Sequence, residues 1–284
     1  MHPVTATNTL WVFVSCSHEP RHLYDIIFAV DCLRCRGIGD AQILVFVDHP
    51  TPGQHLHAYG IEAVFPISAL GAVLSTARAH EHVVLTVAGH GSIVGLGMES
   101  APVRPAALIR ATRSVPGIKL ATLLVTQCFG GIFNLLDAST KPEMVTIGAT
   151  NLNPSASLGI QLSKPLLQRD GSPGIASWSA NIFMMGFFAW LRAPTDVDGD
   201  GAVTMLDAYK HAGASSNEQL RQAKSGLFLH ARKLASDLEV ARESGALPFT
   251  LDAIELKLNR ALSSLHLHQE AWLLHASLAR RIHF

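Results

Sequence analysis

Short, continuous runs of apolar and largely β-branched residues recur along the first half of the chain. Because they do not alternate with polar residues, they are typical of strands that are covered on both faces of a sheet. We expect strands at Leu10–Ser15, Ile43–Val47, Val83–Ala88, Ala121–Thr126 and Val145–Ala149. Apolar residues three and four positions apart predict helices between them, over His22–Arg36, Ile67–His80 and Arg104–Ser114. This alternation predicts an α/β fold with a mainly parallel sheet and helices on both faces.

The second half of the chain has a different pattern. Residues Asn151–Ile175 are rich in Ser, Pro, Gly and Asn and show little periodicity. A loop of this length inside a compact domain usually serves a function, so we expect a lid or a processing segment there. An apolar helix is predicted over Ala180–Leu191, followed by an acidic turn and a long helical tail.

The tail is predicted to form two helices, Asn217–Glu243 and Leu251–Arg281. In the second, apolar residues recur every seven positions at Leu251, Leu258, Leu265 and Trp272, with Ile254 and Ala261 between them. Such a stripe must be buried. We expect it to dock onto the core rather than to pair with another copy, since the repeat is short for a coiled coil. The domains are therefore predicted as 1–212 and a helical C-terminal region, 213–284.

Composition narrows the range of functions. Lys and Arg number 22, as do Asp and Glu, so the formal net charge is zero and no basic surface for nucleic acid or anionic membrane is expected. Charged residues are only 15% of the chain, which indicates that part of the surface meets another protein. Four cysteines are too few for a disulfide framework, and the N-terminus lacks the pattern of a signal peptide. We expect a soluble, cytoplasmic protein.

Two predicted strands end in a chemically reactive residue followed by glycine. These are VVLTVAGHGS, which contains His90 and Gly91, and ATLLVTQCFGG, which contains Cys128. Because neighbouring parallel strands end at one shared crevice, the histidine and the cysteine can meet there although they are far apart in sequence. A thiol nucleophile with a histidine base suits acyl transfer. The backbone N–H groups of Gly91 and Cys128 are the expected oxyanion donors.

These blocks resemble the caspase and legumain clan of cysteine peptidases, in which the histidine also precedes the cysteine. The N-terminal block WVFVSCSHEPRHLYDIIFAVDCLRCRGIGDAQILVFVDHP is similar to the opening of legumains and of the related transamidase that attaches lipid anchors. Arg21 and His22 fall on the Arg-His pair of that opening. The resemblance covers about residues 10 to 212 and implies a caspase-like three-layer sandwich, extended here by the helical C-terminal region.

The resemblance also implies a substrate-binding surface. In these families an arginine near the Arg-His pair lines the pocket for the side chain before the scissile bond, which makes Arg21 the pocket candidate. Ser177, Trp178 and Ser179 are similar to the caspase strand that pairs with the substrate backbone. Caspases carry Ser-Trp-Arg there, and Ser179 replaces that arginine. Gln127 and Thr126 replace the acidic-Ala step of legumains, so neither family's specificity is expected unchanged.

A second pattern, DVDGDGAVTMLD, begins at Asp196. It matches the calcium-binding loop of EF-hands, with aspartate in place of the usual final glutamate. The ligands of that loop are expected at Asp196, Asp198, Asp200, Ala202, Thr204 and Asp207. The alternative is an acidic turn that caps the following helix without a metal, and prokaryotic caspase-like proteins often carry such a segment. The sequence leaves both interpretations open.

These observations predict a cysteine endopeptidase that cleaves a protein or peptide substrate through a Cys128–His90 dyad and a thioester intermediate. No cofactor is required for that chemistry. Resemblance to prokaryotic caspase-like proteases implies a regulatory or defence-linked role. One alternative is a transamidase or ligase that uses the same dyad. Another is a non-catalytic, calcium-responsive interaction module, and the C-terminal helices are where a protein regulator or a second copy is expected to bind.

Overall fold

A seven-stranded sheet forms the centre of the molecule in the computed structural model, which describes residues 2–4, 8–48, 52–97, 102–135, 141–267 and 269–284. All neighbouring strands are parallel except the β12–β9 pair. The strand order is β12 (Trp272–Leu274), β9 (Glu143–Gly148), β8 (Leu120–Val125), β5 (His82–Gly89), β2 (Thr9–Cys16), β3 (Ile43–Val47) and β4 (Val64–Phe65). The predicted mainly parallel α/β sheet is confirmed, and each of the five expected strands is present.

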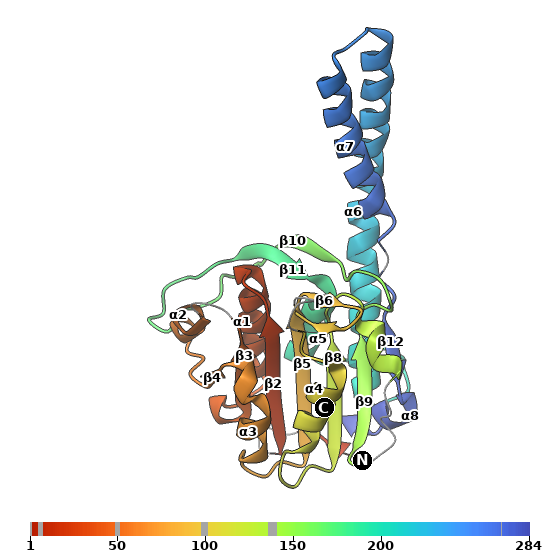
Figure 1. Cartoon of the computed structure of the whole chain (residues 1–284). Coiled ribbons are helices and arrows are strands. Elements are labelled where there is room, and N and C mark those ends of the chain that lie inside the picture. The colour runs from red at the N-terminus through yellow and green to blue at the C-terminus, as the bar shows by residue number, and fades with distance from the viewer. Residues whose placement is uncertain (1, 5–7, 49–51, 98–101, 136–140, 268) are drawn as a thin grey trace.

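Helices cover both faces of the sheet (Figure 1). Alternation along β2 shows how: Trp11 and Phe13 belong to one buried cluster, whereas Val12 and Val14 belong to the other. The first cluster packs under α1 (Pro20–Cys35), α5 (Ile182–Arg192) and the start of α6 (Met205–Glu243). The second packs under α3 (Leu70–Ser75) and α4 (Pro105–Arg113). The strands are apolar throughout because both of their faces are covered, and the architecture is therefore three layers deep.

The remaining short elements join distant parts of the chain. β10 (Ser157–Gln161) pairs antiparallel with β11 (Ser177–Asn181), β6 (Gly91–Ser92) pairs with β7 (Gly95–Leu96), and β1 (His2–Pro3) pairs with β13 (Ile282–His283). A short helix, α2 (Pro52–Ala58), was not predicted, and the predicted helix over 67–80 is only a 3₁₀ turn followed by α3. The segment expected to be a lid forms β10 and is anchored to the core by the buried Leu166.

The C-terminal region differs from the prediction in how its second helix packs and in where that helix ends. α6 is a single helix that passes residue 212 without a break, and α7 (Pro248–Leu265) folds back along it to make a hairpin that projects away from the sheet (Figure 1). The predicted stripe of α7 therefore packs on α6, where Ala261 meets Ala231 and Leu234, and not on the core.

The expected helix over 251–281 ends at Leu265, because the chain then returns to the sheet. Trp272 lies in β12, opposite Gly148 of β9, and its indole fills the space that a side chain at residue 148 would occupy. The indole Nε1 also donates to the carbonyl oxygen of Thr150 over 2.8 Å. The chain then continues through α8 (Ala276–Ala279) to β13. Among the described helices, none combines the length and the apolar character that a membrane span requires.

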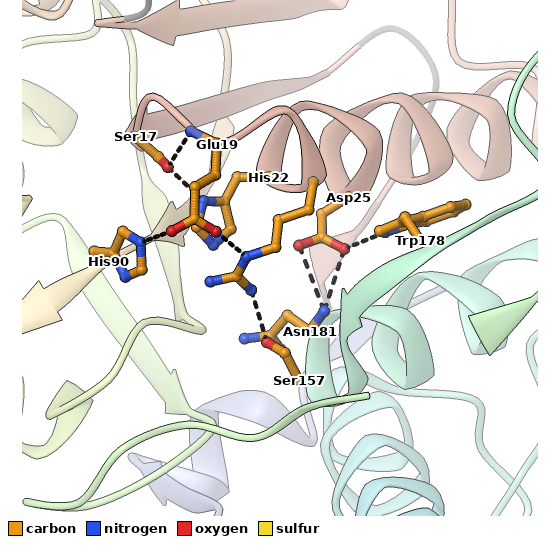
Figure 2. A network of polar contacts seen from close by, with 9 residues as sticks. Ser17, Glu19, His22, Asp25, His90, Ser157, Trp178 and Asn181 are labelled. Atoms are coloured by element: carbon orange, nitrogen blue, oxygen red, sulfur yellow. Dashed lines mark hydrogen bonds and ion pairs between the residues drawn. The ribbon is translucent and has the colours of Figure 1, made fainter. Parts of the chain in front are cut away.

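A buried carboxyl group ties α1 to the β11–α5 junction (Figure 2). Asp25 is fully buried, and its Oδ1 accepts hydrogen bonds from Trp178 Nε1 at 2.9 Å and from the backbone N–H of Asn181 at 3.2 Å. Burial raises the pKa of Asp25 to about 7, although these hydrogen bonds act in the opposite direction. Its protonated form is therefore favoured in the folded state.

This raised pKa predicts how stability varies with pH. The carboxyl group has a pKa near 3.8 in the unfolded chain and about 7 in the folded one, so its contribution is complete below pH 3.8 and is lost as pH rises through 7. We expect the free energy of unfolding of the wild type, relative to Asp25→Asn, to fall by about 1.4 kcal/mol per pH unit within that window. Urea unfolding at several pH values measures the difference. If the free energies of unfolding of the two proteins differ by the same amount at every pH, the raised pKa is contradicted. Lost packing or hydrogen bonds in Asp25→Asn would shift stability equally at all pH values.

Candidate functional site

The parallel pairing of β5 with β8 brings the two expected catalytic segments together. Val87 pairs with Val125, and the backbone N–H of Thr126 continues the ladder to the carbonyl oxygen of Val87 over 3.1 Å. One step further, Gly91 lies so close to Cys128 that a side chain at residue 91 would overlap the carbonyl oxygen of Cys128. Glycine is therefore required beside His90, and both strand ends lie at one edge of the sheet.

Cys128 stands at a sharp turn of the chain. Phe129, the next residue, has a φ of +56°, which is uncommon for a side chain of this size. Its backbone N–H donates to the carbonyl oxygen of Asn153 over 2.9 Å. The half-buried thiol of Cys128 accepts a hydrogen bond from the backbone N–H of Ser155, with an N–Sγ distance of 3.3 Å. This contact holds the sulfur at the turn beside the 151–156 segment.

His90 is held by an acidic residue that sequence reasoning missed. Its Nε2 lies 2.5 Å from Oε1 of Glu19, the residue that precedes the first turn of α1 (Figure 2). Hydrogen bonds from Arg21 and then from His90 lower the pKa of Glu19 to about 2, so this carboxylate is ionised at neutral pH. Since Glu19 occupies Nε2, the Nδ1 atom is the ring nitrogen left to exchange a proton with another group.

Arg21, the expected pocket residue, lies at the same edge of the sheet. Its Nε pairs with Glu19 Oε2, and its Nη1 donates to the hydroxyl of Ser157 over 3.1 Å. The guanidinium therefore bridges Glu19 and the β10 residue Ser157. The structure thus joins Arg21 to His90 through one shared carboxylate.

His22, the other half of the Arg-His pair, is buried beneath His90. Its Nδ1 lies 2.6 Å from the hydroxyl of Ser17, and its ring is edge-on to that of His90 at 5.0 Å between centroids. Burial, followed by the nearby Arg21 and His90, lowers the pKa of His22 to about 3, so the ring is neutral at physiological pH. Ligand atoms of Glu19, His22 and His90 lie within 4.8 Å of one another, so these residues could also hold a metal ion.

A network of polar contacts anchors the 151–156 segment that supports Cys128. Asn181 donates from Nδ2 to the carbonyl oxygen of Thr126 at 2.7 Å and to Ser155 Oγ at 3.1 Å. The backbone N–H of Ala156 donates to the buried Gln269 over 3.1 Å. Neither Asn181 nor Gln269 belongs to a motif in the sequence, and only the folded chain brings them to this segment.

The predicted substrate-binding strand is present as β11, but its residues face different ways. Ser177 and Ser179 are exposed, whereas Trp178 is 9% exposed and packs against α1 with its N–H on Asp25. Alternation along the strand turns the side chain of Trp178 into the core, so the predicted pairing of residue 178 with substrate concerns its backbone and stays a prediction. In the described residues, the ladder partner of β11 is β10.

The acidic loop before α6 brings together three of its expected ligands. Carboxylate oxygens of Asp196, Asp198 and Asp207 lie within 4.8 Å of one another, whereas Asp200 accepts the N–H of Ala202 at 3.0 Å and is outside that group. Asp207 also forms a reciprocal cap with Thr204 at the start of α6. Lys210 pairs with Asp198 at 2.6 Å and lowers the pKa of that carboxyl. The loop is thus both a helix cap and a convergence of carboxylates.

Comparison with known proteins adds no functional assignment to this geometry. No protein-family model matches the chain, and no curated protein matches its sequence. The contacts at the sheet edge are therefore the observations on which a functional proposal rests.

Proposed function

We propose that the chain is a caspase-like cysteine endopeptidase whose nucleophile is Cys128. The observation that supports this most directly is the contact between the Cys128 turn and the His90–Gly91 turn, with His90 held by an ionised carboxylate. A thiol, an imidazole and an anion that orients the imidazole are the groups that acyl transfer by a cysteine nucleophile uses.

In the proposed reaction, Nδ1 of His90 takes the thiol proton and the Cys128 thiolate attacks the carbonyl carbon of the scissile peptide. The backbone N–H groups of Gly91 and Cys128 stabilise the oxyanion of the tetrahedral intermediate. The proton then passes from His90 to the leaving amine, which leaves a thioester on Cys128. Water attacks that thioester with His90 as the base and releases the acid. Glu19 keeps the imidazole in one orientation through its contact with Nε2.

Arg21 lines the proposed pocket for the side chain before the scissile bond. Because Glu19 offsets part of its charge, the pocket suits polar as well as acidic side chains. The proposed surface for the peptide backbone is β11, which carries the exposed Ser177 and Ser179 and pairs with β10, the strand of the Arg21 partner Ser157. The proposed setting is a regulatory or defence-linked prokaryotic protease of the cytoplasm, which acts on few targets. A transamidase would use the same groups but would pass the acyl chain to an amine.

The nucleophile is tested by Cys128→Ala in a positional-scanning peptide library. We expect cleavage to fall by at least about 1,000-fold, because no other group forms the thioester. Cys35→Ala is the matched control, since this exposed thiol lies at the opposite end of α1 from Glu19. The activity of this variant should equal that of the wild type.

A competing amine in the assay separates hydrolysis from transamidation. Cleavage by Cys128→Ala contradicts the proposal, and a Cys128 that stays inert to an acyloxymethylketone favours the interaction module.

The separate roles of Glu19 and Arg21 predict different kinetic effects. Glu19→Gln keeps an oxygen acceptor for Arg21 but removes the charge beside His90, so we expect kcat to fall by about 10- to 100-fold with little change in KM. Arg21→Gln should mainly raise KM, and Glu19→Asp should recover part of the lost kcat. Steady-state kinetics on the best library peptide measures both effects. A Glu19→Gln enzyme with wild-type kcat would exclude its proposed role.

As a second proposal, the acidic loop binds calcium. The donor set fits, because Ca²⁺ prefers oxygen ligands and three carboxylates converge there. A bound ion would offset the mutual repulsion of Asp196, Asp198 and Asp207, and it would compete with Lys210 for Asp198. Because Asp207 also caps α6, calcium binding would stabilise the N-terminal end of that helix.

Calorimetry and thermal unfolding with and without CaCl₂ test this second proposal. We expect the wild type to bind and to melt at a higher temperature with calcium, and we expect Asp196→Asn to lose at least about 10-fold in affinity. Lys210→Gln should bind more tightly, since the competing cation is gone. Asp170→Asn, in an unrelated exposed turn, is the control. A wild type that shows neither heat nor a thermal shift means that the loop is a cap alone.

A further inference from the structure

The α6–α7 hairpin buries little of its own apolar surface. Its inner seam contains Ala231, Leu234 and Ala261 as buried residues. Other residues of the same seam are only partly buried, namely Leu227, Ile254, Leu258 and Leu265. Two helices cannot enclose such a seam from all sides, whereas four helices can. The hairpin therefore has the pattern of half a bundle.

Large apolar side chains are exposed at both ends of the hairpin. Phe228 and Leu229 lie near its base on α6, and Leu247 and Phe249 lie at its tip, each between 52% and 71% exposed. Single exposed apolar residues are ordinary on a protein surface, but this projecting arm carries several, since Val240, Leu256 and Leu262 are also exposed. Apolar side chains thus lie at both ends of the hairpin and along its length.

The base of the hairpin is also hollowed. A surface hollow of about 770 Å³ has apolar walls formed by Leu220, Phe228, Leu229 and Leu265, with Arg221 and Lys224 among its polar residues. It is large enough for an aromatic side chain and its neighbours. The tip residues Leu247 and Phe249 have the chemistry that such a hollow accepts.

The base half and the tip half of the hairpin also differ in charge. The base half, residues 217–235 and 260–270, carries five basic residues and two acidic ones: Arg221, Lys224, Arg232, Lys233 and Arg260, with Glu218 and Glu270. The tip half, residues 236–259, carries five acidic residues and two basic ones: Asp237, Glu239, Glu243, Asp252 and Glu255, with Arg242 and Lys257. Base and tip are thus complementary in charge to each other.

We propose that two copies of this chain pair through their hairpins in antiparallel orientation. The tip of each hairpin then enters the apolar hollow at the base of the other, and the two pairs of helices complete a four-helix bundle. A single twofold axis near the middle of the hairpin satisfies both ends at once, as a symmetric dimer requires. The occupant of the hollow is therefore the Leu247–Phe249 tip of a second copy.

The contact area is sufficient for a stable dimer. From the hollow to the tip, α6 runs for about 20 residues, or roughly 30 Å, and two adjacent helices are about 20 Å wide. Each copy would therefore bury on the order of 600 Å², or about 1,200 Å² in total, which is the lower end of the range for specific complexes. Complementary charge at both ends adds specificity for the antiparallel arrangement.

Charge reversal on the full chain tests the proposal by sedimentation velocity at physiological salt. The base variant is Arg232→Glu with Lys233→Glu, and the tip variant is Asp237→Lys with Glu239→Lys. All four side chains are exposed. In a homodimer of either variant, like charges face each other, so we expect self-association to weaken by at least about 10-fold. An equimolar mixture places opposite charges together at both ends and should dimerise within about threefold of the wild type.

Two further variants complete the experiment. Arg110→Glu with Lys164→Glu makes the same change of net charge as the base variant, at exposed positions on the core, and should dimerise as the wild type does. Phe249→Ser should weaken dimerisation at least about 10-fold, because the hollow then receives no aromatic ring. A wild type that stays monomeric at every concentration, or a mixture that does not recover dimerisation, overturns the proposal. Circular dichroism confirms that each variant keeps its helices.

Discussion

The close parallel pairing of β5 with β8 is the constraint on which the rest of the site depends. Their ladder continues past the end of β8 through Thr126, and Gly91 lies directly against Cys128. Any side chain at residue 91 would push the two turns apart. The sheet thus determines where His90 and Cys128 lie, and the surrounding contacts only adjust their orientation. A rigid, fully buried sheet is well suited to this, because its position does not vary with the exposed loops.

Polar groups from all parts of the chain meet around that pair. Glu19 from the start of α1 holds His90, while Ser155 reaches Cys128 from the segment that Asn181 and Gln269 anchor. Gln269 also lines the hollow at the base of the α6–α7 hairpin. The hairpin base and the cysteine are therefore connected by two hydrogen bonds and a short stretch of backbone. In this arrangement the C-terminal residues belong to the same folded unit as the site.

The sequence predicted the sheet well and the C-terminal region less well, for physical reasons. A strand covered on both faces leaves an unmistakable apolar run, and the residues that follow it must lie at the sheet edge, which was enough to identify His90 and Cys128. Glu19 has no such signal, because its role arises from a contact with a residue far along the chain. Trp272 matched a seven-residue helical repeat, yet it lies in a strand, where its indole packs in the space beside Gly148. Trp178 matched a motif, but strand alternation turns it inward.

The proposed reaction requires Cys128 to form a covalent thioester during turnover. Acid quenching of the reaction with a substrate peptide, followed by mass mapping of the protein, detects this thioester. We expect the tryptic peptide that contains Cys128 to gain the mass of the acyl fragment, hydroxylamine to remove that mass, and His90→Ala to lack it. Turnover without this adduct, or an adduct on another residue, would exclude Cys128 as the nucleophile.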